Sequence, residues 1–146
     1  MQHDPDTAAA SRQKPHQASV LAAVALGGGI GAVARHAASR AWPTAMDAFP
    51  WTTLCVNVVG CALIGILMVT VTETGRRVPP LVRPFLGTGV LGGFTTFSTY
   101  AVDVQHLIER GHPATALTYL AGTLAAALAA VWLASAATRK ALGVPV

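Results

Sequence analysis

Charge is the scarcest property of this sequence. Only 11% of its 146 residues are Asp, Glu, Lys or Arg, whereas about 25% of the residues in a soluble domain are charged. Hydrophobic residues make up 53% of the chain, and the mean hydropathy is +0.52. This composition excludes an ordinary soluble protein and predicts an integral membrane protein.

Acidic residues are few, and none of them lies in the middle of an apolar run. Asp4 and Asp6 are in the N-terminal segment, Asp47, Glu73 and Glu109 lie in connections, and Asp103 lies near the end of a run. We expect Asp103 to lie beyond the hydrocarbon. The distribution argues against mechanisms that need a carboxylate at membrane depth.

Basic residues outnumber the acids, giving a net charge of +4 and a pI near 9.7. They are scattered over the tails and the connections between apolar runs, which is the pattern of membrane topology signals. We therefore expect no nucleic acid partner.

Cysteine is also rare. Cys55 and Cys61 lie six residues apart in one apolar run, on different faces of a helix, and match no metal or redox spacing. We interpret both as small apolar filler. The five histidines show no ligand spacing, and no nucleophile–base pair indicates a membrane enzyme.

The first 17 residues lack apolar periodicity. They are polar and contain proline, so we expect residues 1–17 to form a disordered tail. A signal peptide is the alternative, which we set aside because the following run carries four glycines and no clear cleavage site. We expect a four-helix transmembrane domain over 18–140 and a C-terminal tail over 141–146.

The first apolar run, about 19–42, has small residues at four-residue spacing in its centre, from Gly27 to Ala32. Such spacing lets another helix approach closely, so we expect a packing surface. Arg35 lies in the final third of this run. It either snorkels to the interface or attracts anions to a vestibule.

The second run, 52–72, contains 21 uncharged residues, enough to cross the membrane. Its one strongly polar group is Asn57, and Thr53, Cys61 and Gly65 follow the same helix face at four-residue spacing. Asn57 donates to an ion or serves as interhelical glue.

The third run begins at Pro84 and reaches about residue 109, but its centre makes a poor membrane helix. Gly92 and Gly93 weaken helix propagation, and four hydroxyl residues follow within five positions: Thr95, Thr96, Ser98 and Thr99. Non-helical backbone at membrane depth must be buried in protein or line a wet cavity. With Phe97 and Tyr100 three residues apart, this stretch indicates an ion path.

The fourth run, 113–138, is uncharged and alanine-rich, with Tyr119 and Thr123 one turn apart. Four spans would place both termini on one side. That side would carry seven Arg and Lys residues against three opposite (Arg35, Arg40 and Arg110). The bias favours cytoplasmic termini.

Three stretches carry a resemblance to a known family: Gly28–Arg35, Thr53–Gly60 and Gly92–Tyr100. In order and spacing they resemble the Fluc (CrcB-like) family of fluoride channels, over about residues 19–138. The resemblance implies an all-α integral membrane protein of the bacterial plasma (inner) membrane. It further implies four transmembrane helices, the third broken mid-span, in an antiparallel, dual-topology homodimer surrounded by lipid.

The resemblance also implies two fluoride pores at the subunit interface and a structural sodium ion (Na+) at the dimer centre. Residues that correspond to the family's sodium-binding carbonyls are Gly92 and Thr95. Residues that correspond to the fluoride pore are Phe97, Tyr100, Asn57, Ser98, Thr99, Thr53, Tyr119 and Thr123, with Arg35 as the vestibule arginine. Tyr100 stands where the family pattern has Phe, and we expect its hydroxyl to bond a nearby carbonyl or hydroxyl.

These groups suit fluoride, which is small and strongly hydrated. A pore must replace its water with hydrogen-bond donors without holding the ion too tightly. Neutral donors such as Asn57 and Thr123 meet that need, and aromatic ring edges carry partial positive charge. The expected function is passive fluoride export.

Three other functions compete with a channel. A small four-span, proton-coupled drug exporter needs a carboxylate at membrane depth. A non-transporting assembly subunit would leave the hydroxyl and aromatic residues of 92–100 unexplained. A membrane enzyme is the third.

Overall fold

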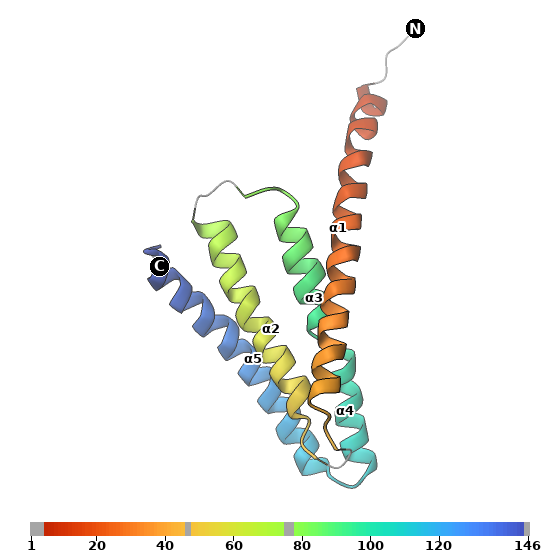
Figure 1. The fold of residues 1–146 in the computed structure, drawn as a ribbon, viewed down its shortest axis with the longest axis vertical. Helices are drawn as coiled ribbons and strands as arrows, with labels where there is room; N and C mark the ends of the chain where they lie inside the picture. Colours follow the sequence, from red (N-terminus) through yellow and green to blue (C-terminus); the bar gives the residue numbers. More distant parts are fainter. Residues whose placement is uncertain (1–4, 46–47, 75–77, 145–146) are drawn as a thin grey trace.

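The computed structural model describes residues 5–45, 48–74 and 78–144, with side chains from residue 17 onward. The described residues form helices only (Figure 1). In order these are α1 (Pro5–Ala41), α2 (Trp51–Met68), the π-helix η1 (Val69–Glu73), the π-helix η2 (Arg83–Leu91), α3 (Gly92–Phe94), α4 (Ser98–Glu109) and α5 (Pro113–Leu142).

Three helical stretches in the described part are long and apolar enough to cross a membrane. They are Gln17–Ala41, Trp51–Glu73 and Pro113–Leu142, with 25, 23 and 30 residues. About 20 residues span the hydrocarbon of a bilayer. The prediction of an all-α integral membrane protein is therefore confirmed.

Residues 83–109 have a different architecture. Helices η2, α3 and α4 contain 9, 3 and 12 residues. Between α3 and α4 the backbone at Thr95 is extended, with φ −72° and ψ 157°. This interruption falls within the glycine and threonine stretch that sequence reasoning singled out.

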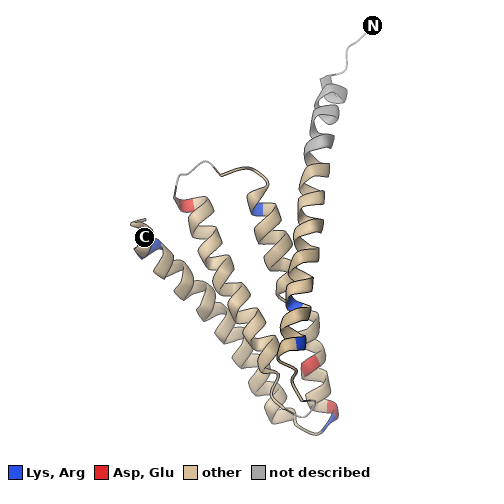
Figure 2. Cartoon of the chain, in the orientation of Figure 1, with Lys and Arg blue, Asp and Glu red and all other residues tan. Residues whose placement is uncertain are grey.

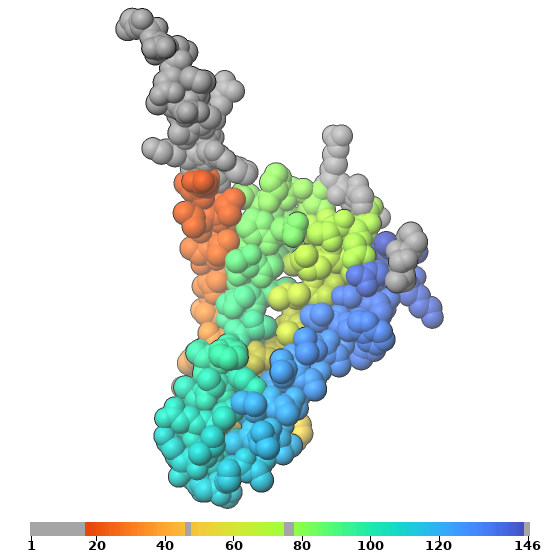
Figure 3. Space-filling model, turned by 180° about the vertical axis from the view of Figure 1, so that it is seen from behind, coloured from red at the N-terminus to blue at the C-terminus, as the bar shows by residue number. Residues whose placement is uncertain are grey.

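The helices form two arms that diverge toward the end carrying both termini (Figure 1). Helix α1 packs along η2, and α2 packs along α5, whereas α1 and η2 have few contacts with α2. At the opposite end α4 packs on α5, and the buried cluster of Leu107, Ala116 and Tyr119 joins them. From behind, the space between the arms remains visible (Figure 3).

Glycines set the distance between α1 and η2. A Cβ atom on Gly27 would collide with the Phe85 carbonyl, and one on Gly31 would collide with the Val90 carbonyl. Gly28 and Gly29 face open space. The expected packing surface on the first span is confirmed, and Gly27 and Gly31 form it.

Two chain ends differ from expectation. Helix α1 begins at Pro5, so residues 5–17 are helical where a disordered tail was predicted, and residues 1–4 lie outside the described part. Proline suits the first helical turn, and Ala8, Ala9 and Ala10 favour extending an existing helix. Likewise α5 reaches Leu142, into the predicted C-terminal tail, and Gly143 ends it with φ +66°.

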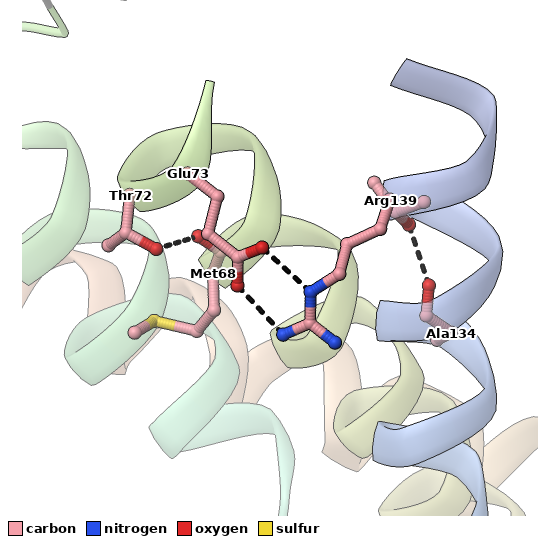
Figure 4. Close-up of polar contacts among 6 residues, drawn as sticks. Met68, Thr72, Glu73, Ala134 and Arg139 are labelled. Atoms are coloured by element: carbon pink, nitrogen blue, oxygen red, sulfur yellow. Dashed lines mark hydrogen bonds and ion pairs between the residues drawn. The ribbon is translucent and has the colours of Figure 1, made fainter. Parts of the chain in front are cut away.

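Most charged residues lie near the ends of the molecule (Figure 2). At the open end Arg139 of α5 binds Glu73 of η1 through two contacts, Nε to Oε2 at 2.7 Å and Nη2 to Oε1 at 2.8 Å (Figure 4). The neighbouring Thr72 hydroxyl donates to the Met68 carbonyl (Figure 4). This ion pair joins the ends of η1 and α5, which belong to the same arm. It lies at the end of the molecule where the two arms are furthest apart.

Candidate functional site

Asn57 of α2 holds the backbone of the interruption. Its Nδ2 donates to the Thr96 carbonyl at 3.0 Å, and the Thr96 N–H donates to Asn57 Oδ1 at 2.8 Å. Both residues are buried. Backbone groups released from a helix need partners when water is excluded, and a carboxamide offers a donor and an acceptor together. Asn57 thus contacts the broken backbone directly, which matches the interhelical alternative that the sequence left open and leaves its role toward an ion untested.

The Thr96 side chain caps the N-terminal end of α4. Its hydroxyl accepts the Thr99 N–H at 3.1 Å and donates to Thr99 Oγ1 at 3.0 Å, with Ser98 Oγ at 3.4 Å. A threonine that accepts an N–H three residues on is a helix cap. Sequence reasoning assigned Thr96 no specific role, although a threonine placed just before a restarting helix is a signal for such a cap.

These bonds leave two carbonyls without their usual helical donors. In a continuous helix the Gly92 carbonyl would receive the Thr96 N–H, and the Thr95 carbonyl would receive the Thr99 N–H. Both N–H groups bond elsewhere, to Asn57 Oδ1 and Thr96 Oγ1. The residues predicted to offer carbonyls to a cation are those whose helical bonds are diverted.

Arg35 of α1 reaches the same place. Its Nε donates to the Gly93 carbonyl at 3.2 Å, across 58 residues of sequence. Neither alternative from the sequence, snorkelling to the interface or lining a vestibule, anticipated a bond to the broken helix.

A cavity of about 300 Å³ lies beside the interruption. Its walls come from α2, α4, α5 and the segment between α3 and α4: Asn57, Cys61, Thr95, Thr96, Phe97, Tyr100, Thr123, Leu124 and Ala127. The structure therefore brings four of the predicted pore residues together: Asn57, Phe97, Tyr100 and Thr123. Ser98, Thr99, Thr53, Tyr119 and Arg35 are not among the lining residues.

Thr123 is the unusual member of this wall. The residue is only 5% exposed, and its Oγ1 is buried with no hydrogen-bond partner in the part of the chain that the structure describes. An unpaired buried hydroxyl costs about 1–3 kcal/mol. The same residue is one of those that line the cavity.

The two aromatic residues of the interruption differ in exposure. Phe97 is 80% exposed, and its ring lies 5.7 Å from that of Tyr100. The Tyr100 hydroxyl donates to the Leu120 carbonyl at 2.7 Å. The prediction that this phenol bonds a nearby carbonyl is confirmed.

Tyr119 is fully buried at the closed end of the molecule. Its hydroxyl donates to Asp103 Oδ2 at 3.1 Å, and its ring packs 5.3 Å from both Tyr100 and Phe49. Thr53 and Asp103 share a second cavity of about 140 Å³ with His106. Sequence reasoning gave Asp103 no contact with the site, because it lies 16 residues before Tyr119 on another helix and only the packing of α4 on α5 brings them together.

Three long apolar helices, with an interrupted helix beside a cavity that Asn57, Thr96 and Thr123 help to line, define the molecule as a multi-pass membrane protein. Within that class its family is clear. The sequence profile described as "CrcB-like protein, Camphor Resistance (CrcB)" matches residues 22–135. The chain belongs to this family.

Relatives with established names agree. The chain is 63% identical over 126 residues to fluoride-specific ion channel FluC 1 of Streptomyces coelicolor, covering 86% of this chain and 81% of the relative. It is 66% identical over 108 residues to FluC 2 of Streptomyces avermitilis, covering 74% and 68%. It is 51% identical over 138 residues to FluC 2 of Nocardia farcinica, covering 92% and 96%.

Proposed function

We propose that this chain is a fluoride-selective channel that lowers cytoplasmic fluoride by passive export. The observation that carries the proposal is the buried Thr123 hydroxyl on the cavity wall, which has no partner among the described residues. A neutral hydroxyl can donate a hydrogen bond to an anion without placing a fixed positive charge in the site. The names of the relatives support fluoride as the anion.

The rest of the cavity wall suits a small anion that must pass through. Asn57 Nδ2 carries a second N–H besides the one bonded to Thr96. Phe97 and Tyr100 present ring edges, where the partial charge is positive. No residue of this wall carries a full charge, so the cavity offers weak, multiple contacts of the kind that permit release.

The proposed topology counts four spans. Helices η2, α3 and α4 follow one another between the second and third apolar stretches, and together they are long enough to form one further crossing. Both termini of one chain would then lie on the same side of the bacterial plasma (inner) membrane.

The proposed assembly is an antiparallel, dual-topology homodimer. Phe97 borders the cavity yet is 80% exposed, so a single chain leaves the site open on that side. A second copy would close it and shield the ring. Lipid would cover outward apolar side chains such as Leu128 and Trp132.

A structural sodium ion also fits the residues present. The carbonyls of Gly92 and Thr95 have lost their helical donors, and oxygen ligands of this kind hold hard cations. Two chains would offer four such carbonyls. When bound, the ion would compensate the partial negative charge of these dipoles.

The test is fluoride efflux from liposomes that contain the purified protein, measured with a fluoride electrode. We expect rapid fluoride release and no chloride release above that of empty vesicles. Fluoride release equal to that of empty vesicles would refute the proposed function.

A proton-coupled exporter of small cationic drugs is the second candidate, and Asp103 is the observation that favours it. Its carboxylate contacts the fully buried Tyr119, so one acid is partly enclosed by protein. The same liposomes with a pH gradient separate the two functions: uptake of a cationic dye that disappears in Asp103→Asn would support the exporter.

A further inference from the structure

Arg35 of α1 contacts the C-terminal end of α3, a helix that stops inside the molecule. Its Nε–H bonds the carbonyl of Gly93, the middle residue of α3. Helix α3 ends at Phe94 and Thr95 is extended, so the Phe97 N–H no longer follows in helical register. Terminal carbonyls of a helix need donors, and their partial negative charge favours a nearby cation.

The approach of α1 explains how Arg35 reaches this carbonyl. Gly31 lies one turn before Arg35, and a Cβ atom there would lie 2.7 Å from the Phe94 nitrogen. On the other side, a Cβ on Gly93 would collide with the Gly28 carbonyl. Glycines on both helices therefore bring the two backbones together, and the next turn of α1 presents Arg35 to the helix end.

We propose that Arg35 is a positioning residue that caps the end of α3 through the Gly93 carbonyl. Arg35 of α1 holds the backbone before Thr95, and Asn57 of α2 holds it after Thr95. Together they fix where Phe97 stands beside the cavity. This role rests on the proposed function only in that fluoride flux is one of its two readouts. Capping also differs from the vestibule role, in which the Arg35 charge attracts anions.

Three substitutions separate donor from charge. Arg35→Gln places an amide nitrogen the same number of bonds from Cα as Nε, so it keeps an N–H donor and removes the charge. Arg35→Met places a methyl group there and removes both. Arg35→Lys keeps the charge. Arg40, exposed in the last turn of α1, supplies the matched controls Arg40→Gln and Arg40→Met.

Fluoride efflux is measured for each variant at two ionic strengths. Capping predicts that Arg35→Gln stays within about threefold of the wild type while Arg35→Met loses about tenfold, the loss of a hydrogen bond to a charged donor. The effect is expected to be independent of salt. If Arg35→Gln falls as far as Arg35→Met, and further at low ionic strength, the charge acts on the anion and capping is wrong. Wild-type flux in all variants also refutes it.

Hydrogen–deuterium exchange of the amides at 95–99 gives a readout independent of transport. Capping predicts faster exchange in Arg35→Met and wild-type exchange in Arg35→Gln. If the wild type carries no fluoride, the proposed function fails and this comparison still decides the role of Arg35: equal exchange in all variants refutes capping. If Arg35→Met does not fold, the Arg35→Gln results decide alone. A charge role requires Arg35→Gln to lose fluoride efflux, whereas capping requires it to retain efflux.

Discussion

Two neighbouring regions of this molecule treat buried polar groups in opposite ways. At the interruption, the N–H and carbonyl of Thr96 and the carbonyl of Gly93 all have partners supplied by other helices. On the adjoining cavity wall the Thr123 hydroxyl is buried with no partner in the described part of the chain, and Phe97 is largely exposed.

The difference separates scaffold from binding surface. A broken helix inside a membrane is stable only when its backbone is satisfied, and Asn57 and Arg35 supply partners for the Thr96 and Gly93 groups. An unsatisfied hydroxyl is costly, and under the proposed function fluoride would be the partner of Thr123. The predictions below test whether substitutions in the two regions have different consequences.

Asn57→Asp should have the largest effect, because it damages both regions. The new carboxylate cannot donate to the Thr96 carbonyl and adds a negative charge beside the cavity. A charge at this depth costs about 2.5–3.5 kcal/mol, so we expect fluoride efflux to fall about a hundredfold or more. Cys55→Ala, on the same helix but outside the cavity lining, is the control. Near-normal efflux in Asn57→Asp would confine Asn57 to helix packing.

Phe97→Ile should lose most of the flux, whereas Tyr100→Phe should retain it. The Tyr100 hydroxyl already bonds the Leu120 carbonyl, so its removal takes no donor from the ion. The two variants are compared in the same liposome assay. An inactive Tyr100→Phe channel would make the hydroxyl part of the pore, and an active Phe97→Ile channel would remove the role of aromatic edges.

Thr123→Val should move stability and activity in opposite directions. Replacing an unpaired buried hydroxyl with a methyl group should leave the free energy of unfolding unchanged or raise it by about 1 kcal/mol. The melting temperature should therefore stay equal or rise. Efflux should fall about tenfold if the lost donor contacts fluoride. Thr118→Val on the same helix, where the hydroxyl bonds the Ala114 carbonyl, should leave efflux unchanged. Unaltered efflux in Thr123→Val would mean that the hydroxyl faces no ion.

Gly31→Ala should have the smallest effect on transport chemistry and act through packing. The added methyl group meets the backbone of η2 at Val90 and of α3 at Phe94, and overpacking costs about 1–3 kcal/mol. Gly28→Ala, on the same helix but facing open space, should leave thermal stability in detergent unchanged. Equal melting temperatures for the two variants would show that α1 and η2 are less closely packed than described.

Much of the fold was predictable from local patterns. Uninterrupted apolar runs predicted the three long helices, and the poor helix-forming residues near Gly92 predicted where the regular backbone would fail. The N-terminal tail was less predictable: polarity argued for disorder, whereas helix propensity and the adjoining span extend α1 back to Pro5.

The partners at the site were less predictable because they are distant in sequence. Asn57 and Thr96 lie 39 residues apart, and Arg35 and Gly93 lie 58 apart. Periodicity shows which residues share a helix face, but not which face meets which. That is why the sequence left Asn57 between an ion donor and interhelical glue, and why Arg35 was expected at an interface or vestibule.

The native cysteines allow the most direct test of the claim that fluoride passes through the cavity beside Thr123. Cys61 lines this cavity and Cys55 does not. Two proteins are compared in liposomes, one with Cys61 only (Cys55→Ala) and one with Cys55 only (Cys61→Ala). Each is treated with a small methanethiosulfonate reagent, and labelling is confirmed by mass spectrometry. We predict that labelling Cys61 blocks fluoride efflux and that the Cys55-only protein keeps it. Full labelling of Cys61 with undiminished efflux would contradict the account.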